Sequence, residues 1–206
     1  MMLLHRPDRD EIRAFIADQA PLPFSYPEVG ATRGTPPAGY RIAHHRVGLG
    51  SGHAVFERAI TALRDWRMFA LPGVELCWPD APIAVGTTVA ILAGAGRLWS
   101  LNACRIVYVV DEHDALVRAG FAYGTLPEHA VRGEERFLIE WSRASDEVFY
   151  DLLAFSRPSA WWLRLGQPLL RRMQGRFARG SLAAMRRTLA GAAPTARRPP
   201  KPNRPG

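Results

Sequence analysis

The chain has 206 residues, 48% of them apolar and 22% charged, a composition typical of one globular domain and not of a disordered or fibrous chain. Its longest uncharged run, residues 81–96, is too short and too rich in Gly, Thr and Pro to span a bilayer, which needs about 20 apolar residues. The formal net charge is +8, and the two cysteines, Cys77 and Cys104, have no metal-ligand spacing, so we expect a cytoplasmic protein with buried thiols and no bound metal or cofactor.

The positive charge is concentrated in the last quarter of the chain. Residues 1–151 contain 15 Arg and 19 acidic residues, a net charge of −4, whereas residues 152–206 contain 12 basic residues and no acidic one. Every basic residue except Lys201 is an arginine, which indicates a GC-rich genome more than a phosphate-binding surface. The composition therefore predicts no specific nucleic-acid partner.

In chain order, the first expected element is a short helix that is capped by Asp8 or Asp10 and ends near Gln19. Residues 21–39 follow, and their many Pro and Gly residues predict an irregular connection.

The next expected elements are a strand over residues 40–50 and a helix over residues 52–66. Ser51 lies between them and is the expected N-cap of the helix. Apolar side chains at helical spacing predict one buried face of this helix, formed by Val55, Phe56, Ala59, Ile60 and Leu63.

After this helix the apolar residues recur with a period of two, which is typical of strands. No helix-length pattern separates the runs, so the sheet is expected to be an antiparallel meander and not a βαβ arrangement. Six runs bounded by Gly, Pro, Asp or Asn are the expected strands: residues 74–78, 87–92, 101–110, 115–125, 134–142 and 148–156.

The last expected element is a long helix from Pro168 to about Ala190. Its two sides differ, because Leu170, Met173, Phe177, Ala184 and Met185 fall on one and Arg172, Arg176, Arg179, Arg186 and Arg187 on the other. The pattern as a whole predicts an α+β fold in which an antiparallel meander sheet grips this helix, with short N-terminal helices. Residues 1–190 are expected to form a single domain, and the basic, Pro-rich residues 191–206 a disordered tail.

Residues 115–125 and 133–142 are expected to form a hairpin whose register follows from the side chains. With Thr125 opposite Gly133, Arg118 pairs with Glu140 on one face. A slip of one residue would bury arginines and expose large apolar side chains, so the register is well defined. The other face then carries Phe121, Tyr123, Phe137, Ile139 and Trp141.

Two adjacent glutamates follow the hairpin loop. Because neighbouring side chains in a strand point to opposite faces, Glu134 and Glu135 cannot act as a carboxylate pair. Glu135 is expected on the apolar face beside Tyr123, either paired or with a pKa raised by desolvation. Two interpretations stay open: a structural hydrogen bond that ties the loop to the sheet, or a polar anchor at the mouth of an apolar cavity.

Two further stretches have simple structural explanations. His129 lies in the hairpin loop with no second histidine at metal-ligand spacing, and we expect it to be solvated. Residues 48–52, between a strand and a helix, have the position of a phosphate-binding loop, but they lack the last glycine of G-x-G-x-x-G and a Walker lysine. A tight turn explains them better.

Several stretches resemble one protein family. "YGTLPEHAVRGEERF" (residues 123–137), "AFSRP" (154–158), "GRFARGSLAAM" (175–185) and, less specifically, "LGSGHAVFERAITALRDWRMF" (49–69) are similar to the uncharacterised family catalogued as domain of unknown function 1990. The likeness covers roughly residues 5–190 and implies no established activity. The order of elements is also similar to the helix-grip fold of START and Bet v 1-like proteins, which implies a cavity between sheet and closing helix.

These observations leave three functions open. The leading hypothesis is a non-catalytic binder of a small apolar or amphipathic ligand. The second is an enzyme that uses Glu135 as acid or base and Tyr123 as donor. The third is an interaction protein whose basic helix and tail contact an acidic partner or a membrane surface. The residues expected to contact a ligand are Phe121, Tyr123, Thr125, Glu135, Phe137, Trp141, Tyr150 and Arg157.

Overall fold

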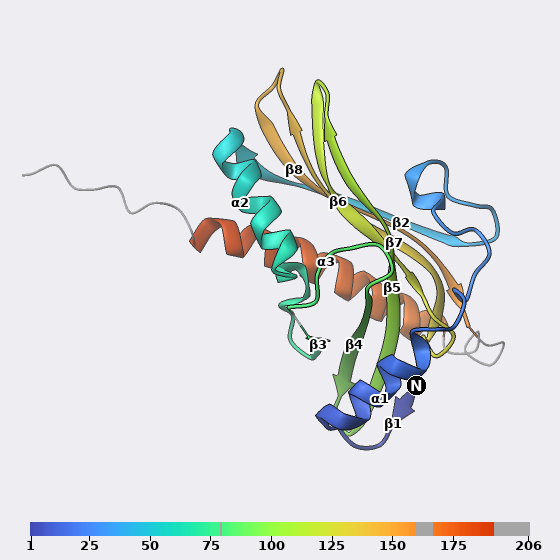
Figure 1. Ribbon diagram of the computed structural model, residues 1–206. Helices are drawn as coiled ribbons and strands as arrows, with labels where there is room; N and C mark the ends of the chain where they lie inside the picture. The colour runs from blue at the N-terminus through green and yellow to red at the C-terminus, as the bar shows by residue number, and fades with distance from the viewer. Residues whose placement is uncertain (79, 160–166, 192–206) are drawn as a thin grey trace, which may run out of the picture.

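The computed structural model describes residues 1–78, 80–159 and 167–191 (Figure 1). The tail that was predicted to be disordered lies outside the described residues from residue 192 on. The α-helices are α1 (Arg9–Gln19), α2 (His53–Arg64) and α3 (Gln167–Gly191), and the 3-10 turns are η1 (Ala31–Arg33) and η2 (Arg67–Phe69). The strands are β1 (Met2–Leu3), β2 (Arg41–Ser51), β3 (Val74–Cys77), β4 (Thr88–Ala95), β5 (Leu98–His113), β6 (Leu116–Thr125), β7 (Val131–Ser142) and β8 (Glu147–Pro158).

The strands form one antiparallel sheet with the order β2-β8-β7-β6-β5-β4-β3, and β1 pairs with β5 outside this path. From β3 to β8 each strand lies beside the next one along the chain, so the predicted meander is confirmed. The predicted hairpin register is confirmed as well, because Tyr123 pairs with Glu135 and Arg118 with Glu140.

The sheet carries helices on both faces. α2 and α3 pack with η2 on one face, called here the inner face, where alternate residues of every strand from β3 to β8 form the main core. In Figure 1, α3 runs along this face and α2 lies next to it. α1 packs on the outer face over β4 and β5 through Ile12 and Phe15. Asp8 caps α1, as predicted, by accepting hydrogen bonds from the backbone N–H groups of Asp10 and Glu11 at 2.9 Å.

The start of α2 differs from the prediction. Ser51 is still part of β2 and pairs with Glu147, so it does not cap the helix. The N-cap is Gly52, which has a φ of 92° and no side chain to cap with. Its N–H group donates to the carbonyl of Asp146 at 2.8 Å, so a positive-φ turn takes the chain directly from strand to helix.

α3 packs on the sheet with the sides that the sequence predicted. Phe177, Ala184 and Met185 face the protein, and Met185 is fully buried. The five arginines named above are exposed. The side chains of Leu170 and Met173 lie outside the described residues. None of the helices in the described ranges combines the length and apolar character that a membrane span needs.

Candidate functional site

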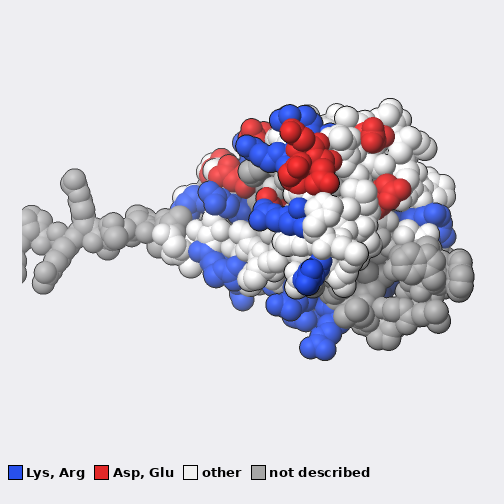
Figure 2. All heavy atoms as spheres, turned by 90° about the horizontal axis from the view of Figure 1, so that it is seen from below, with Lys and Arg blue, Asp and Glu red and all other residues white. Residues whose placement is uncertain are grey.

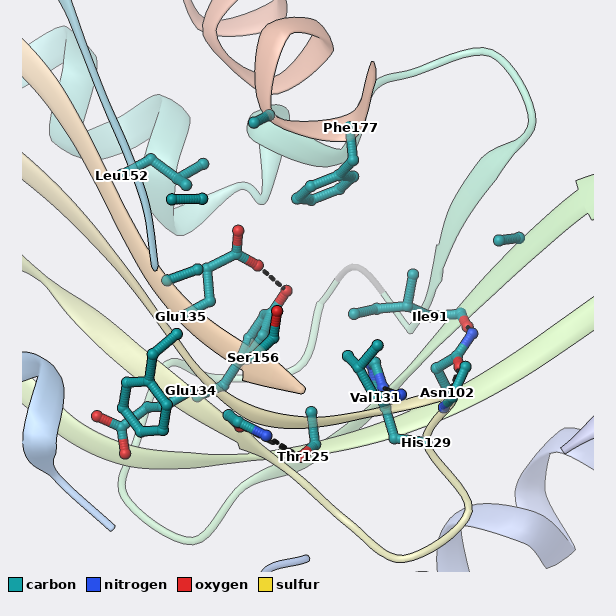
Figure 3. A pocket seen from close by; sticks show the side chains of 18 of the residues that line it. Ile91, Asn102, Thr125, His129, Val131, Glu134, Glu135, Leu152, Ser156 and Phe177 are labelled. Carbon is teal, nitrogen blue, oxygen red and sulfur yellow. Dashed lines mark hydrogen bonds between the residues drawn. The ribbon is translucent and has the colours of Figure 1, made fainter. Parts of the chain in front are cut away.

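A cavity of about 250 Å³ lies between the inner face of the sheet and α3. Phe177 projects into it from α3, and Glu135 and Leu152 reach it from the sheet (Figure 3). More than half of the described residues that line it are apolar or glycine. This is the usual character of a small-molecule site, although the volume lies just below the usual range of about 300–1,000 Å³.

Small side chains create this space. At six lining positions the residue is alanine or glycine, where a larger side chain would fill the volume between sheet and helix: Ala43, Ala93, Ala130, Gly133, Ala154 and Ala178. The large aromatic residues of the sheet pack against one another beside the cavity. Phe121 and Phe137 have ring centroids 5.2 Å apart and are fully buried.

Two glutamates are among the residues that line this cavity, and Glu135 is the one whose side chain lies on the inner face. It comes from β7, and the Tyr123 hydroxyl on β6 donates a 2.7 Å hydrogen bond to its Oε2. Glu135 makes no ion pair with any described residue, and its carboxyl group points into the space below Phe177 and Leu152 (Figure 3). Tyr123 therefore holds one carboxyl oxygen, and among the described residues none bonds the other, which leaves it available to the cavity.

The apolar surroundings change the acidity of this group. Burial raises the pKa of Glu135 from 4.5 to about 7, and the hydrogen bond from Tyr123 opposes part of that effect. Burial, followed by the nearby charge of Glu135, raises the pKa of Tyr123 well above its usual value, so this tyrosine stays a hydrogen-bond donor. At neutral pH the cavity thus holds a carboxyl group that is close to half ionised.

Glu134 lies on the opposite face, as predicted, but it is not a solvated polar residue. Its carboxylate is buried and accepts hydrogen bonds from the Tyr26 hydroxyl (2.7 Å), from the N–H groups of Gly30 (2.7 Å) and Thr32 (2.9 Å), and from the Thr32 hydroxyl. It therefore ties the connection between α1 and β2 to the outer face of the sheet. One sign of this role in the sequence is the Tyr, Gly and Thr content of that connection.

Two glycines of the hairpin make this arrangement possible. A side chain at Gly124 would collide with the Tyr26 ring, which lies over the strand to reach Glu134. Gly133 has a φ of 152°, and a Cβ there would collide with the carbonyl of Phe155 on β8. The two adjacent glutamates are thus placed by glycines that let neighbouring segments approach the strand closely.

His129 differs from the prediction of a solvated loop residue. It lines the cavity, and its Nδ1 accepts a 3.1 Å hydrogen bond from the N–H of Val131. Burial, followed by the charge of the nearby N-terminal amino group, lowers the pKa of His129 to about 4. The ring is therefore neutral at pH 7, and its proton is on Nε2 because Nδ1 accepts a hydrogen bond. His129 is buried because the loop folds back over the cavity instead of extending into solvent.

The structure brings three of the eight predicted ligand-contacting residues together at the cavity: Tyr123, Thr125 and Glu135. Phe121, Phe137 and Tyr150 are fully buried in the core instead. Trp141 packs against Phe56 (ring centroids 5.8 Å apart), and Arg157 is exposed and lies over the Tyr40 ring at 4.6 Å. Ligand contact by these five residues stays a prediction, and none of the five is among the described residues that line the cavity.

The basic side of α3 forms a separate exposed surface. No ion pair joins Arg172, Arg176, Arg179, Arg186 or Arg187 to a carboxylate within the described part of the chain. On the face shown in Figure 2, both acidic and basic side chains are visible in the upper half, whereas the charged side chains visible in the lower half are all basic. A role of this surface in contacting an acidic partner or a membrane stays a prediction.

Comparison with known proteins identifies the family. The family model described as "Domain of unknown function (DUF1990)" matches residues 25–184, a range that contains every residue lining the cavity. The chain belongs to this family. A "UPF0548 protein" of Dictyostelium discoideum is 33% identical to this DUF1990 chain over 195 residues, which cover 86% of the chain and 90% of the relative. A "UPF0548 protein" of Deinococcus radiodurans is 42% identical over 195 residues, covering 87% and 94%.

Among solved structures, a point mutant of norcoclaurine synthase from Thalictrum flavum is similar to the DUF1990 chain, with a TM-score of 0.44 and 12% identity. The match covers 74% of this chain and 95% of that one.

Proposed function

We propose that this DUF1990 protein binds a small apolar or amphipathic molecule in the cavity between the sheet and α3. The observation that carries the proposal is a carboxyl group with an available oxygen inside an otherwise largely apolar cavity. Protein interiors rarely contain voids larger than a water molecule, so packing alone does not explain a space of this size. The body of the ligand would lie against Phe69, Phe177 and Ile91, and its polar end would bind at Glu135.

The identity of a bound molecule can be sought directly. Native mass spectrometry of the purified protein should show a retained small molecule, and denaturation should release it. Binding of octan-1-ol, measured by isothermal titration calorimetry, tests the same cavity with a defined neutral probe.

Two variants on one helix make this test specific to the cavity. Ala178→Leu places a larger side chain in the cavity and should abolish octan-1-ol binding, whereas Ala183→Leu changes the same helix outside the cavity lining and should leave it intact. If wild-type protein retains no molecule and binds no octan-1-ol, or if both variants bind equally well, the proposal is wrong.

A second candidate is acid–base catalysis in the same cavity. A carboxyl group whose pKa is about 7 can both accept and donate a proton at neutral pH, and Tyr123 holds it in place. On this hypothesis the retained molecule should be converted over time by wild-type protein, and Glu135→Gln should stop the conversion without preventing binding. A retained molecule that stays unchanged would support binding alone.

A further inference from the structure

The buried carboxylates of the outer face provide the comparison for Glu135. Asp151 binds the Arg136 guanidinium at 3.0 Å and the His44 ring at 2.7 Å. Glu140 binds two arginines, Arg46 at 2.9 Å and Arg118 at 3.1 Å. These carboxylates have cationic partners, and Glu134 accepts hydrogen bonds from four donor groups, so the negative charge of each is compensated by the protein.

Glu135 has no such compensation within the described residues. Its partner is the Tyr123 hydroxyl, and the other titratable groups that act on it or feel its charge are Cys104 on β5 and Tyr150 on β8. Burial raises the pKa of each of these two groups well above its usual value, so both stay protonated and neutral. A neutral thiol or phenol supplies no positive charge to Glu135. A buried carboxylate that lacks a cation is costly, and a ligand that supplies the cation would remove that cost.

The other charged or titratable residues among the described lining are Glu134, Arg41 and His129. Glu134 adds no cation, because it is itself a carboxylate bound by its four donor groups on the outer face. Arg41 is in register with Ser156, two residues along β8 from Ala154, which is the partner of Glu135. His129 comes from the loop before β7 and is neutral at pH 7. On α3, the arginines that flank Phe177 are exposed. A cation beside Glu135 would thus meet no cationic group of the strands that flank it.

The aromatic rings next to Glu135 also favour a cation. Phe69 lies 6.3 Å from Tyr123 and 5.4 Å from Phe177, measured between ring centroids, and all three rings line the cavity. The face of an aromatic ring carries partial negative charge and attracts ammonium groups when water is excluded. A carboxylate with three rings nearby is the combination expected for an organic ammonium group on an apolar body.

We infer that the ligand is an amphipathic amine, whose ammonium group binds the Glu135 carboxylate and whose hydrocarbon body fills the remainder of the cavity. The inference rests on the proposed function, because it requires that the cavity binds a small molecule. It adds the chemical class of the polar end, and it distinguishes a cationic end from a neutral or anionic one.

Three probes with the same hydrocarbon body test this inference: octylamine, octan-1-ol and octanoate, titrated calorimetrically into wild-type protein. We expect octylamine to bind at least tenfold more tightly than octan-1-ol at pH 8, and octanoate to bind weakest. Since the pKa of Glu135 is about 7, octylamine affinity should rise by roughly tenfold from pH 6 to pH 8, while octan-1-ol affinity should not rise.

Variants locate the effect at one carboxyl group. Glu135→Gln should reduce the preference for octylamine over octan-1-ol to about one and should remove the pH dependence, and Glu147→Gln, an exposed glutamate on β8, should change neither. Should Glu135→Gln not fold, the pH profile of the wild-type protein still decides the question. Equal binding of octylamine and octan-1-ol at pH 8 would overturn the amine inference and leave the proposed function standing. Failure of all three probes to bind would overturn the amine inference, and it would overturn the proposed function as well if the purified protein also retains no molecule.

Discussion

Replacing Glu135 by Gln should change the stability of the protein in a way that depends on pH. Gln has the shape of a protonated Glu and can still accept the hydrogen bond from Tyr123, but it cannot ionise. Below about pH 4.5 the native carboxyl group is protonated, so wild-type protein and the variant should have nearly the same free energy of unfolding.

The two proteins should diverge as the pH rises. Glu135 has a pKa of 4.5 when exposed and about 7 in the native protein, so between these values the unfolded chain loses its proton while the folded protein keeps it. Ionisation therefore favours the unfolded state, and stability is lost as pH rises from about 4.5 to about 7 and is constant above that. The pKa shift from 4.5 to about 7 corresponds to a loss of at most roughly 3 kcal/mol in the free energy of unfolding, since one pKa unit is about 1.4 kcal/mol. The group is partly accessible from the cavity, which makes the loss smaller.

The expected result is that Glu135→Gln is more stable than wild-type protein at pH 8 by up to roughly 3 kcal/mol and equal to it at pH 4.5. Urea denaturation at a series of pH values measures this difference, and Glu147→Gln provides the control, with no comparable pH-dependent gain. A loss of stability in Glu135→Gln of similar size at every pH would refute the reasoning. Glu135 would then act as a structural tie to Tyr123, the first of the two interpretations that the sequence left open.

Three further predictions concern residues around the site. Gly133→Ala should destabilise the protein by about 1–3 kcal/mol in urea denaturation, because of its positive φ and the carbonyl beside it, and Gly48→Ala, which has room for a methyl group, should cost less. Glu134→Gln should cost about 2–4 kcal/mol and make residues 20–40 more sensitive to protease, because an amide nitrogen cannot accept the bonds that the carboxylate accepts. His129 should titrate near pH 4 by NMR, with stability lost as pH falls from 6.5 toward 4.

The sheet could be predicted from the sequence because its register is determined by side chains that are local to each strand. A shift by one residue would have exchanged Phe137 and Ile139 for Arg136 and Glu140 on the inner face, and no compensating contact could offset that change. The start of α2 was harder to predict. Whether Ser51 or Gly52 precedes the helix depends on the ladder between β2 and β8, which brings together segments about 100 residues apart.

The role of Glu134 could not be predicted for a related reason. Its donors come from the connection between α1 and β2, which has little regular structure and docks on the outer face as a consequence of those same hydrogen bonds. The pattern of the strand places Glu134 on the outer face, but not the segment that covers it. A carboxylate that looks solvated in the sequence is therefore buried in the structure.

The position of the cavity could not be predicted from the sequence either, because it depends on how distant segments pack together. The aromatic face of the hairpin was a reasonable place to expect a ligand, since aromatic side chains offer the largest apolar contact area. In the structure these rings pack against one another and leave no space, and the cavity lies beside them, where alanine and glycine from several strands and from α3 coincide. An alanine in a strand such as Ala154 gives no sign that the residues opposite it, Phe69 and Ala178, will fail to fill the gap. This cavity forms where small residues on different elements meet, so it can be found only once those elements have been placed. Tyr123, Thr125 and Glu135 could be assigned to it beforehand, because strand alternation places their side chains on the inner face. The loss of water there gives Glu135 the raised pKa on which both the binding and the stability predictions depend.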